Sequence, residues 1–191
     1  RVPGNNPSAI FGTLSSNGKL VLVNPSGIAV GAGAVVDTAG FTASTLRMSD
    51  ANALAGRLIF GDGFTTGGLT VGGQIVARSG DIVLIAPDVQ TSGTALLDAP
   101  LGATVLAAGR QIEITGRGLE GIRLGVQAPE DRAVNLGSLQ GDAVGIFAGT
   151  LQHSGLVRAT AVSAEGGKVI LKGQQSAEIS GQVVARGANG L

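Results

Sequence analysis

The stretch Asn24-Pro25-Ser26-Gly27-Ile28 separates two apolar, strand-like runs at residues 19–23 and 34–36. Asparagine caps turns with its side chain, proline fixes φ, and glycine permits a positive φ, so these residues favour a tight corner. Serine at position 26 keeps a small side chain that can bond the nearby backbone. The sequence therefore predicts a strand, a sharp corner and a second strand near the start of the chain.

Three blocks flank this corner: residues 1–12 (RVPGNNPSAIFG), 43–51 (ASTLRMSDA) and 54–60 (LAGRLIF). Together with the corner they resemble the secretion domain of filamentous-haemagglutinin-type exoproteins, which are two-partner secretion (TPS) passengers. The pattern of that family is Asn-Pro-Asn-Gly-Ile, and the chain matches it at Asn24, Pro25, Gly27 and Ile28. Ser26 departs from the pattern, and an earlier Asn-Pro-Asn-Leu motif of the family is absent.

The resemblance implies export across the outer membrane of a Gram-negative bacterium by a dedicated β-barrel transporter. It assigns Asn24, Pro25, Gly27 and Ile28 to a turn that the transporter recognises or that nucleates folding, while a purely structural corner is the alternative. We expect residues 1–65 to be the C-terminal part of a secretion domain that is truncated at its N-terminus. Residues 66–191 are expected to continue as further rungs with no clear boundary.

Composition favours short strands over disorder or helices. The chain has 33 glycines and 43% hydrophobic residues, against 14% charged and 3% aromatic residues. Disorder requires low hydrophobicity and high net charge, which this composition does not have. Short runs of β-branched and aliphatic residues bounded by Gly, Asn, Asp or Pro are typical of strands.

These strands recur at a steady spacing. Residues 82–86 and 104–108 begin 22 positions apart, and residues 73–78 and 80–85 return in similar form at 181–186 and 167–172. These longer separations of 108 and 87 residues correspond to about five and four units of 22. The spacing predicts an all-β fold, a right-handed parallel β-helix with about 22 residues per rung, although a β-sandwich or propeller also uses short strands.

A parallel β-helix fills a narrow interior with alternate side chains, and small aliphatic residues suit it. We also expect a short helix over residues 49–55 with Ser49 or Asp50 as its cap. The side chains predicted to lie inside are Ile75, Ile82, Leu84, Val105, Ile112, Ile114, Val169, Leu171, Ile179 and Val183.

Little in the sequence points to catalysis, a metal or a cofactor, and we expect none. His153 is the only histidine, cysteine is absent, and no Gly-x-Ser-x-Gly elbow is present, so we interpret His153 as a solvated turn residue. Residues 60–63 (FGDG) are an isolated approach to a calcium-binding repeat and are interpreted as a turn.

Two other stretches have a functional and a structural interpretation. Glu130-Asp131-Arg132 is the only local concentration of charge, and it indicates either a carbohydrate site or, as we expect, a solvated loop between rungs. Residues 116–121 match Gly-x-Gly-x-x-Gly, but the alternating segment that follows ends in Pro129 and does not suit the helix of a dinucleotide site. A corner between rungs is the expected structure there.

Charge narrows the range of partners. The 13 basic and 13 acidic residues balance, which provides no electrostatic basis for binding nucleic acid. With the resemblance, the favoured function is a fragment of a secreted adhesin that attaches at the cell surface to a host or bacterial receptor or glycan. The alternatives are a contact-dependent growth inhibition protein that delivers a toxin and a β-helical carbohydrate-active enzyme.

Overall fold

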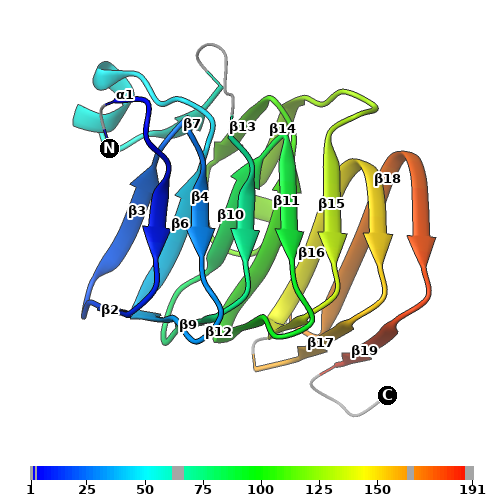
Figure 1. Ribbon diagram of the computed structural model, residues 1–191. Helices are drawn as coiled ribbons and strands as arrows, with labels where there is room; N and C mark the ends of the chain where they lie inside the picture. Colours follow the sequence, from blue (N-terminus) through cyan, green and yellow to red (C-terminus); the bar gives the residue numbers. More distant parts are fainter. Residues whose placement is uncertain (1, 3, 62–66, 163–165, 188–191) are drawn as a thin grey trace.

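The computed structural model describes residue 2 and residues 4–61, 67–162 and 166–187, and shows a chain that winds repeatedly around one axis (Figure 1). Each turn of the chain, or rung, contributes short strands to three faces, and successive rungs pair in parallel. The predicted parallel β-helix is confirmed. Ile82 pairs in register with Thr104, so the spacing of 22 residues is the length of that rung.

Face 1 is the row of strands in front in Figure 1 and contains β1 (Ser8–Ile10), β4 (Ile28–Val30), β8 (Leu69–Val71), β11 (Asp88–Thr91), β15 (Arg132–Asn135) and the ends of β16 (Ser138–His153) and β18 (Lys168–Ile179). Face 2 lies at the bottom and contains β2 (Thr13–Ser15), β5 (Val35–Thr38), β9 (Gln74–Ala77), the starts of β12 (Leu96–Ala108) and β16, β17 (Leu156–Thr160) and β19 (Gln182–Arg186). Face 3 contains β3 (Lys19–Val23), β6 (Gly40–Ser44), β10 (Ile82–Ala86), the end of β12, the middle of β16 and the start of β18.

Two segments leave the β-helix and return to it. The first, described over residues 45–61, carries α1 (Asp50–Leu54) and β7 (Leu58–Phe60), and the second, residues 109–131, carries β13 (Gln111–Ile114), η1 (Leu119–Gly121) and β14 (Ile122–Val126). The strands β14, β13 and β7 form an antiparallel sheet. The predicted short helix is confirmed, with Ser49 as its N-cap and the Ser49 hydroxyl accepting from the Asn52 N–H.

These excursions correct the count of rungs. Gln74 and Gln182 occupy the same column, but four rungs separate them instead of the predicted five. Ile82 and Val169 are three rungs apart instead of four. Residues 109–131 are about as long as one rung but are not stacked in the β-helix, so the sequence spacing overcounts by one.

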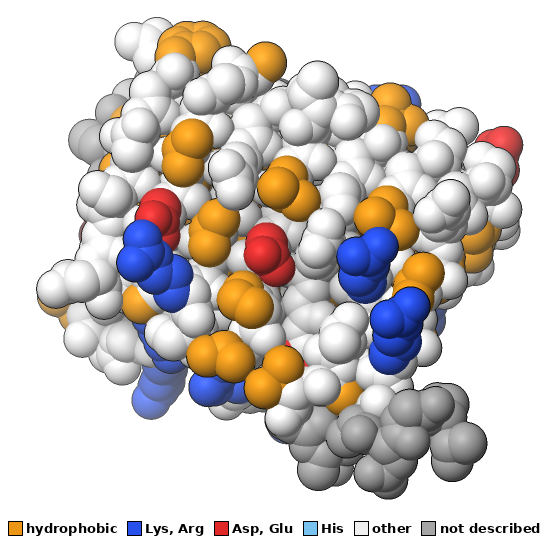
Figure 2. All heavy atoms as spheres, turned by 90° about the horizontal axis from the view of Figure 1, so that it is seen from below, with side chains coloured by type: hydrophobic (Ala, Val, Ile, Leu, Met, Phe, Trp, Pro, Cys, Tyr) orange, Lys and Arg blue, Asp and Glu red, His pale blue; other side chains and the backbone are white. Residues whose placement is uncertain are grey.

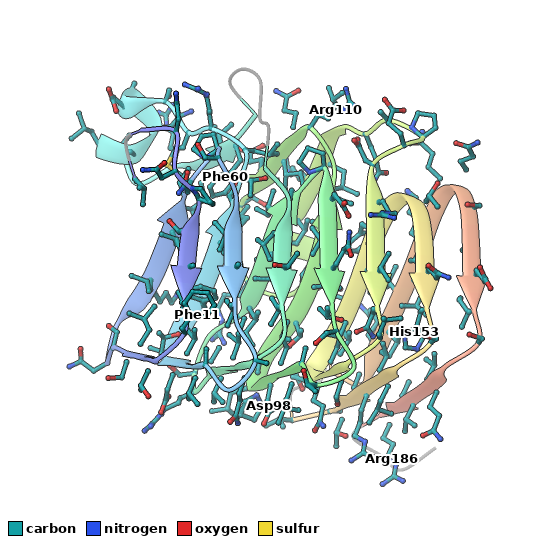
Figure 3. All side chains as sticks on the ribbon, in the orientation of Figure 1. Phe11, Phe60, Asp98, Arg110, His153 and Arg186 are labelled. Carbon is teal, nitrogen blue, oxygen red and sulfur yellow. The ribbon has the colours of Figure 1, made fainter. Side chains whose placement is uncertain are left out.

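The buried side chains form two clusters. The first fills the interior of the β-helix and includes Ile75, Ile82 and Leu84, as predicted, with Val169 and Leu171 half-buried against it. The second lies between face 3 and the antiparallel sheet, and Phe60 is fully buried there (Figure 3).

Several predicted interior positions are wrong. Val105 and Ile112 are buried and Ile114 is partly buried, but all three belong to the second cluster, outside the β-helix. Ile179 and Val183 are 49% and 42% exposed, because no described strand stacks on β18 and β19 beyond them.

Polar contacts hold the second excursion against the rungs. Asp81 accepts from the Ala103 N–H through Oδ1 at 2.8 Å and from the Gly118 N–H through Oδ2 at 3.1 Å. Arg117 Nη2 donates to the carbonyls of Ser79 and Leu101.

Within the described part of the chain, no helix has the length and apolar character needed to cross a membrane.

Candidate site at the Asn24 corner

The corner after β3 is closed by hydrogen bonds from its own backbone. The Gly27 N–H donates to the Asn24 carbonyl at 3.1 Å, and the Ser26 N–H donates to Asn24 Oδ1 at 3.0 Å. Gly27 has a φ of +124°, a conformation that side chains with a Cβ rarely adopt. Asparagine and glycine therefore occupy the two positions at which this corner requires them.

The Asn24 side chain is fully buried although it is polar. Its Nδ2 donates to the Asn6 carbonyl at 2.9 Å and to Ser8 Oγ at 2.8 Å. With the bond from Ser26, both ends of the amide are satisfied, as burial of a polar group requires. Asn24 thereby fastens the segment before β1 to the corner of the next turn of the chain.

Glycines of the third rung stack on the opposite side of the corner. The Gly67 N–H donates to the Pro25 carbonyl at 3.1 Å, and the Ile28 N–H donates to the Gly68 carbonyl at 3.1 Å. A Cβ on Gly67 would lie 2.2 Å from the Gly27 nitrogen, far closer than atoms can approach. The corner is therefore enclosed between two neighbouring turns of backbone.

The structure brings the four predicted site residues together in this one corner. Ile28 is the first residue of β4, is 2% exposed and packs in the interior. At the position that departs from the family pattern, Ser26 Oγ donates to the Gly4 carbonyl at 3.3 Å. Since Asn24 is fully buried, its side chain offers no contact surface once the corner has formed.

Sequence reasoning missed the partners of the corner, which are Asn6, Ser8, Gly67 and Gly68. One signal was present, because Asn-Pro-Ser occurs at residues 6–8 and again at 24–26. The repeated tripeptide marks the two segments that the Asn24 side chain connects.

A shallow groove of about 710 Å³ lies on the edge between faces 2 and 3, on another part of the surface. Arg78 Nε donates to Asp37 Oδ1 at 2.6 Å, and a second bond joins Arg78 Nη2 to Asp37 Oδ2. The hydrogen bonds from Arg78 lower the pKa of the Asp37 carboxyl. The groove is lined by Ser15, Ser16, Asn17, Asp37, Ala39, Arg78 and Ser79.

The prediction for His153 is wrong, because this side chain is fully buried at the inner end of β16 (Figure 3). Asn135 Oδ1 accepts from Thr91 Oγ1 at 2.6 Å and from the Gly137 N–H at 3.2 Å. The Asn135 Nδ2 group is therefore the donor to His153 Nδ1 at 3.0 Å. His153 Nε2 then carries the ring proton and donates to the Gln182 carbonyl at 3.2 Å.

The interpretation of Glu130-Asp131-Arg132 as a solvated loop is also wrong in part. Asp131 is 1% exposed, and its carboxylate accepts from Arg110 Nε at 3.0 Å and from the Ala128 N–H at 2.5 Å. Glu130 pairs with Arg110, and Arg132 with Asp88. The hydrogen bond that Arg110 donates to Asp131 raises the pKa of Arg110. The pairs of Arg110 join the two ends of the second excursion, and the pair of Arg132 with Asp88 joins two neighbouring strands of face 1.

The two remaining candidate motifs have different outcomes. Residues 116–121 are not a corner between rungs, because they connect the antiparallel strands β13 and β14. Residues 62–63 of the calcium-like turn lie outside the described residues. Among the residues that the structure does describe, no three His, Asp or Glu side chains are grouped so as to hold a metal ion.

Comparisons with known proteins agree with this geometry. The model of the TPS secretion domain family matches residues 1–189. The chain is also similar to the crystal structure of the HMW1 secretion domain from Haemophilus influenzae, with 31% identity and a TM-score of 0.84. That match covers 97% of this chain and 51% of the HMW1 chain, so the protein spans about half the length of that relative. None of the curated proteins matches significantly.

Proposed function

The chain belongs to the family of TPS secretion domains, and from that premise we propose that it directs a large exoprotein through a dedicated outer-membrane transporter of a Gram-negative bacterium. TPS exoproteins are secreted across the outer membrane, and their secretion domain is a non-catalytic module. The family implies a TpsB β-barrel as the partner. The enzyme alternative therefore has no support from the comparisons.

The proposed role of Asn24, Pro25, Gly27 and Ile28 is to nucleate the β-helix outside the cell. The full burial of the Asn24 amide carries this proposal, since both hydrogen bonds that its Nδ2 donates form only when the first two turns of chain have come together. In the extended chain the same residues are accessible, and the transporter could contact them there by strand addition. Recognition would then precede nucleation.

Closure of this corner would favour export because of the geometry of a solenoid. Each rung contacts mainly its neighbours, so a formed rung presents a paired edge on which the next rung can be added. The second rung hydrogen-bonds to Gly67 and Gly68 of the third through the corner itself. Rungs that have formed outside would oppose the return of the chain.

Secretion of the full-length exoprotein with its transporter tests the proposal, with the protein scored in the medium and in the periplasm. Asn24→Ala and Ser8→Ala both weaken the folded corner, but only Asn24→Ala changes the predicted recognition motif. Loss of export in both variants, in proportion to their loss of stability, is the result expected for nucleation. Loss of export with Asn24→Ala but not with Ser8→Ala would indicate that the corner serves in recognition by the transporter and not in nucleation. Normal export of Asn24→Ala would remove both roles.

Surface attachment is the proposed end use, with a host or bacterial receptor or glycan as the partner. The long exposed faces of the β-helix support an adhesin, and the secretion domain is equally compatible with delivery of a toxin. Binding of the full-length protein to host cells, set against inhibition of neighbouring bacteria on contact, separates these two uses. The division of the chain at residue 65 stays a prediction.

A further inference from the structure

Face 2 presents a surface of outward-pointing side chains, which Figure 2 views from below. Five adjacent strands of this face are in register: β9, the start of β12, the start of β16, β17 and β19. Every second residue of these strands points outward, because the residues between them are core residues of the interior. Two parallel rows result. The first row is Gln74, Leu96, Ser138, Leu156 and Gln182, and the second is Val76, Asp98, Gln140, Arg158 and Val184.

Both rows are symmetric about the central strand, β16. In the first row the central Ser138 has a leucine on each side, and beyond each leucine is a glutamine. In the second row the central Gln140 has a charged residue on each side and a valine beyond each. Only Asp98 and Arg158 break the symmetry, and they do so with opposite charges.

Neither of these two charged side chains is paired within the described part of the chain. The side chains of Asp98 and Arg158 form no hydrogen bond or ion pair with any residue in the described part of the structure. They are two rungs apart, about 9.6 Å at the usual spacing of paired strands, with Gln140 between them. A second copy could supply the missing partner of each charge.

We propose that two copies of this chain associate through face 2, around a two-fold axis that runs along β16. Such an axis reverses the order of the rungs and preserves the two rows. Leu96 then meets the partner's Leu156, Asp98 meets the partner's Arg158, and Val76 meets the partner's Val184. Ser138 and Gln140 meet their own copies on the axis. The two β-helix axes run antiparallel, and the ion pair between Asp98 and Arg158 forms twice.

One contact at the edge of this interface needs a separate account. Arg78 follows β9 and Arg186 is the last residue of β19, so the two would face each other across the axis. Arg78 is already paired with Asp37, so its charge is locally compensated before the partner approaches. The like charges therefore do not oppose the interface strongly.

The size of the surface sets the strength of association. Five strands about 4.8 Å apart, with two or three outward residues each, cover only a few hundred Å² per copy. Stable complexes bury about 800 Å² per partner, so we expect a weak dimer with a Kd on the order of 0.1–1 mM. Because exposed ion pairs are screened by salt, the association should weaken at high ionic strength.

Charge reversal gives a sharp test by sedimentation of the chain at concentrations up to about 1 mM. Asp98→Arg places two bases, and Arg158→Asp two acids, on each copy, so each variant alone should be monomeric. An equimolar mixture restores both ion pairs and should dimerise at least as well as the wild type. Arg123→Asp, on the exposed edge of β14, is the matched control and should dimerise normally.

The position of the axis can be tested independently, because the chain contains no cysteine. Oxidation should link the Gln140→Cys variant into disulfide dimers, since residue 140 meets its own copy on the axis. Thr13→Cys lies on the same face, four rungs from β16, and should stay unlinked. Monomeric wild type at the highest concentration, a mixture of the reversed variants that stays monomeric, or end-to-end polymers would each overturn the proposal.

Discussion

Asn24 Nδ2 donates to Ser8 Oγ at 2.8 Å, which joins residues 16 positions apart in the sequence. Asn24→Ala removes this bond and leaves the Asn6 carbonyl and the Ser26 N–H without their partner. We expect a loss of about 2–4 kcal/mol in the free energy of unfolding, measured with urea. Ser8→Ala should cost about 1 kcal/mol, and the double variant less than the sum of the two. Additive losses would contradict the coupling.

Gly67→Ala should disrupt the stacking of the third rung on the Asn24 corner. The new Cβ would lie 2.2 Å from the Gly27 nitrogen and 2.3 Å from its Cα, and neither backbone atom can move alone. A loss of about 2 kcal/mol or more in stability is expected, in line with other backbone conflicts. Gly12→Ala is the matched control because no atom lies within 4 Å of its Cβ. Equal melting temperatures for the two variants would argue against the close stacking.

His153→Leu should destabilise the fold although the new side chain is apolar. The substitution leaves Asn135 Nδ2 without a hydrogen-bond partner in the interior and removes a donor from the Gln182 carbonyl. Each unsatisfied buried group costs about 1–3 kcal/mol, which exceeds the gain from a buried leucine methyl. Thermal unfolding should show the loss, whereas Ser154→Ala, at the exposed neighbouring position, should have little effect. A His153→Leu variant as stable as wild type would show that the hydrogen bonds contribute nothing net.

Asp81→Asn should loosen the β13–β14 hairpin. The carboxylate accepts from two backbone N–H groups, and an amide can accept from only one of them. Amide exchange in residues 111–126 should accelerate severalfold while exchange in β3 and β6 stays unchanged. The control is Asp98→Asn, measured at dilute protein concentration. The Asp98 carboxylate has no hydrogen-bond partner in the described chain, so its neutralisation should not affect the hairpin. Uniform acceleration across the chain would indicate global destabilisation instead.

The sequence allowed prediction of the repeating fold but not of the strands outside it. Ile82 and Thr104 pair because the same alternation returns at each rung. An alternating strand such as β13 has the same pattern whether it stacks in a rung or lies outside. One available signal is the continuous apolar run in β10, all of it buried, since a strand buried on both faces does not alternate.

The buried polar residues were harder to predict. His153 lies in a polar tetrapeptide that looks like a solvated corner, yet it is the last residue of a strand and points inward. Thr91, Asn135 and His153 each end a strand and each precede a glycine by two positions. That recurrence was visible, but only the register shows that the three side chains bond one another. Asn24 was recognised from its motif, but its partners Asn6 and Ser8 lie just before the first strand and at its first residue.

The pairing of β7 with β13 has a consequence for how the molecule unfolds. In an ideal solenoid, stability is a sum of nearest-neighbour terms, and the array can fray rung by rung from either end. Here, β7 follows the second rung and β13 follows the fourth, and the two strands pair directly with each other outside the third rung. Fraying from the C-terminal side should therefore stop at this long-range link, and the N-terminal rungs should melt as one cooperative block.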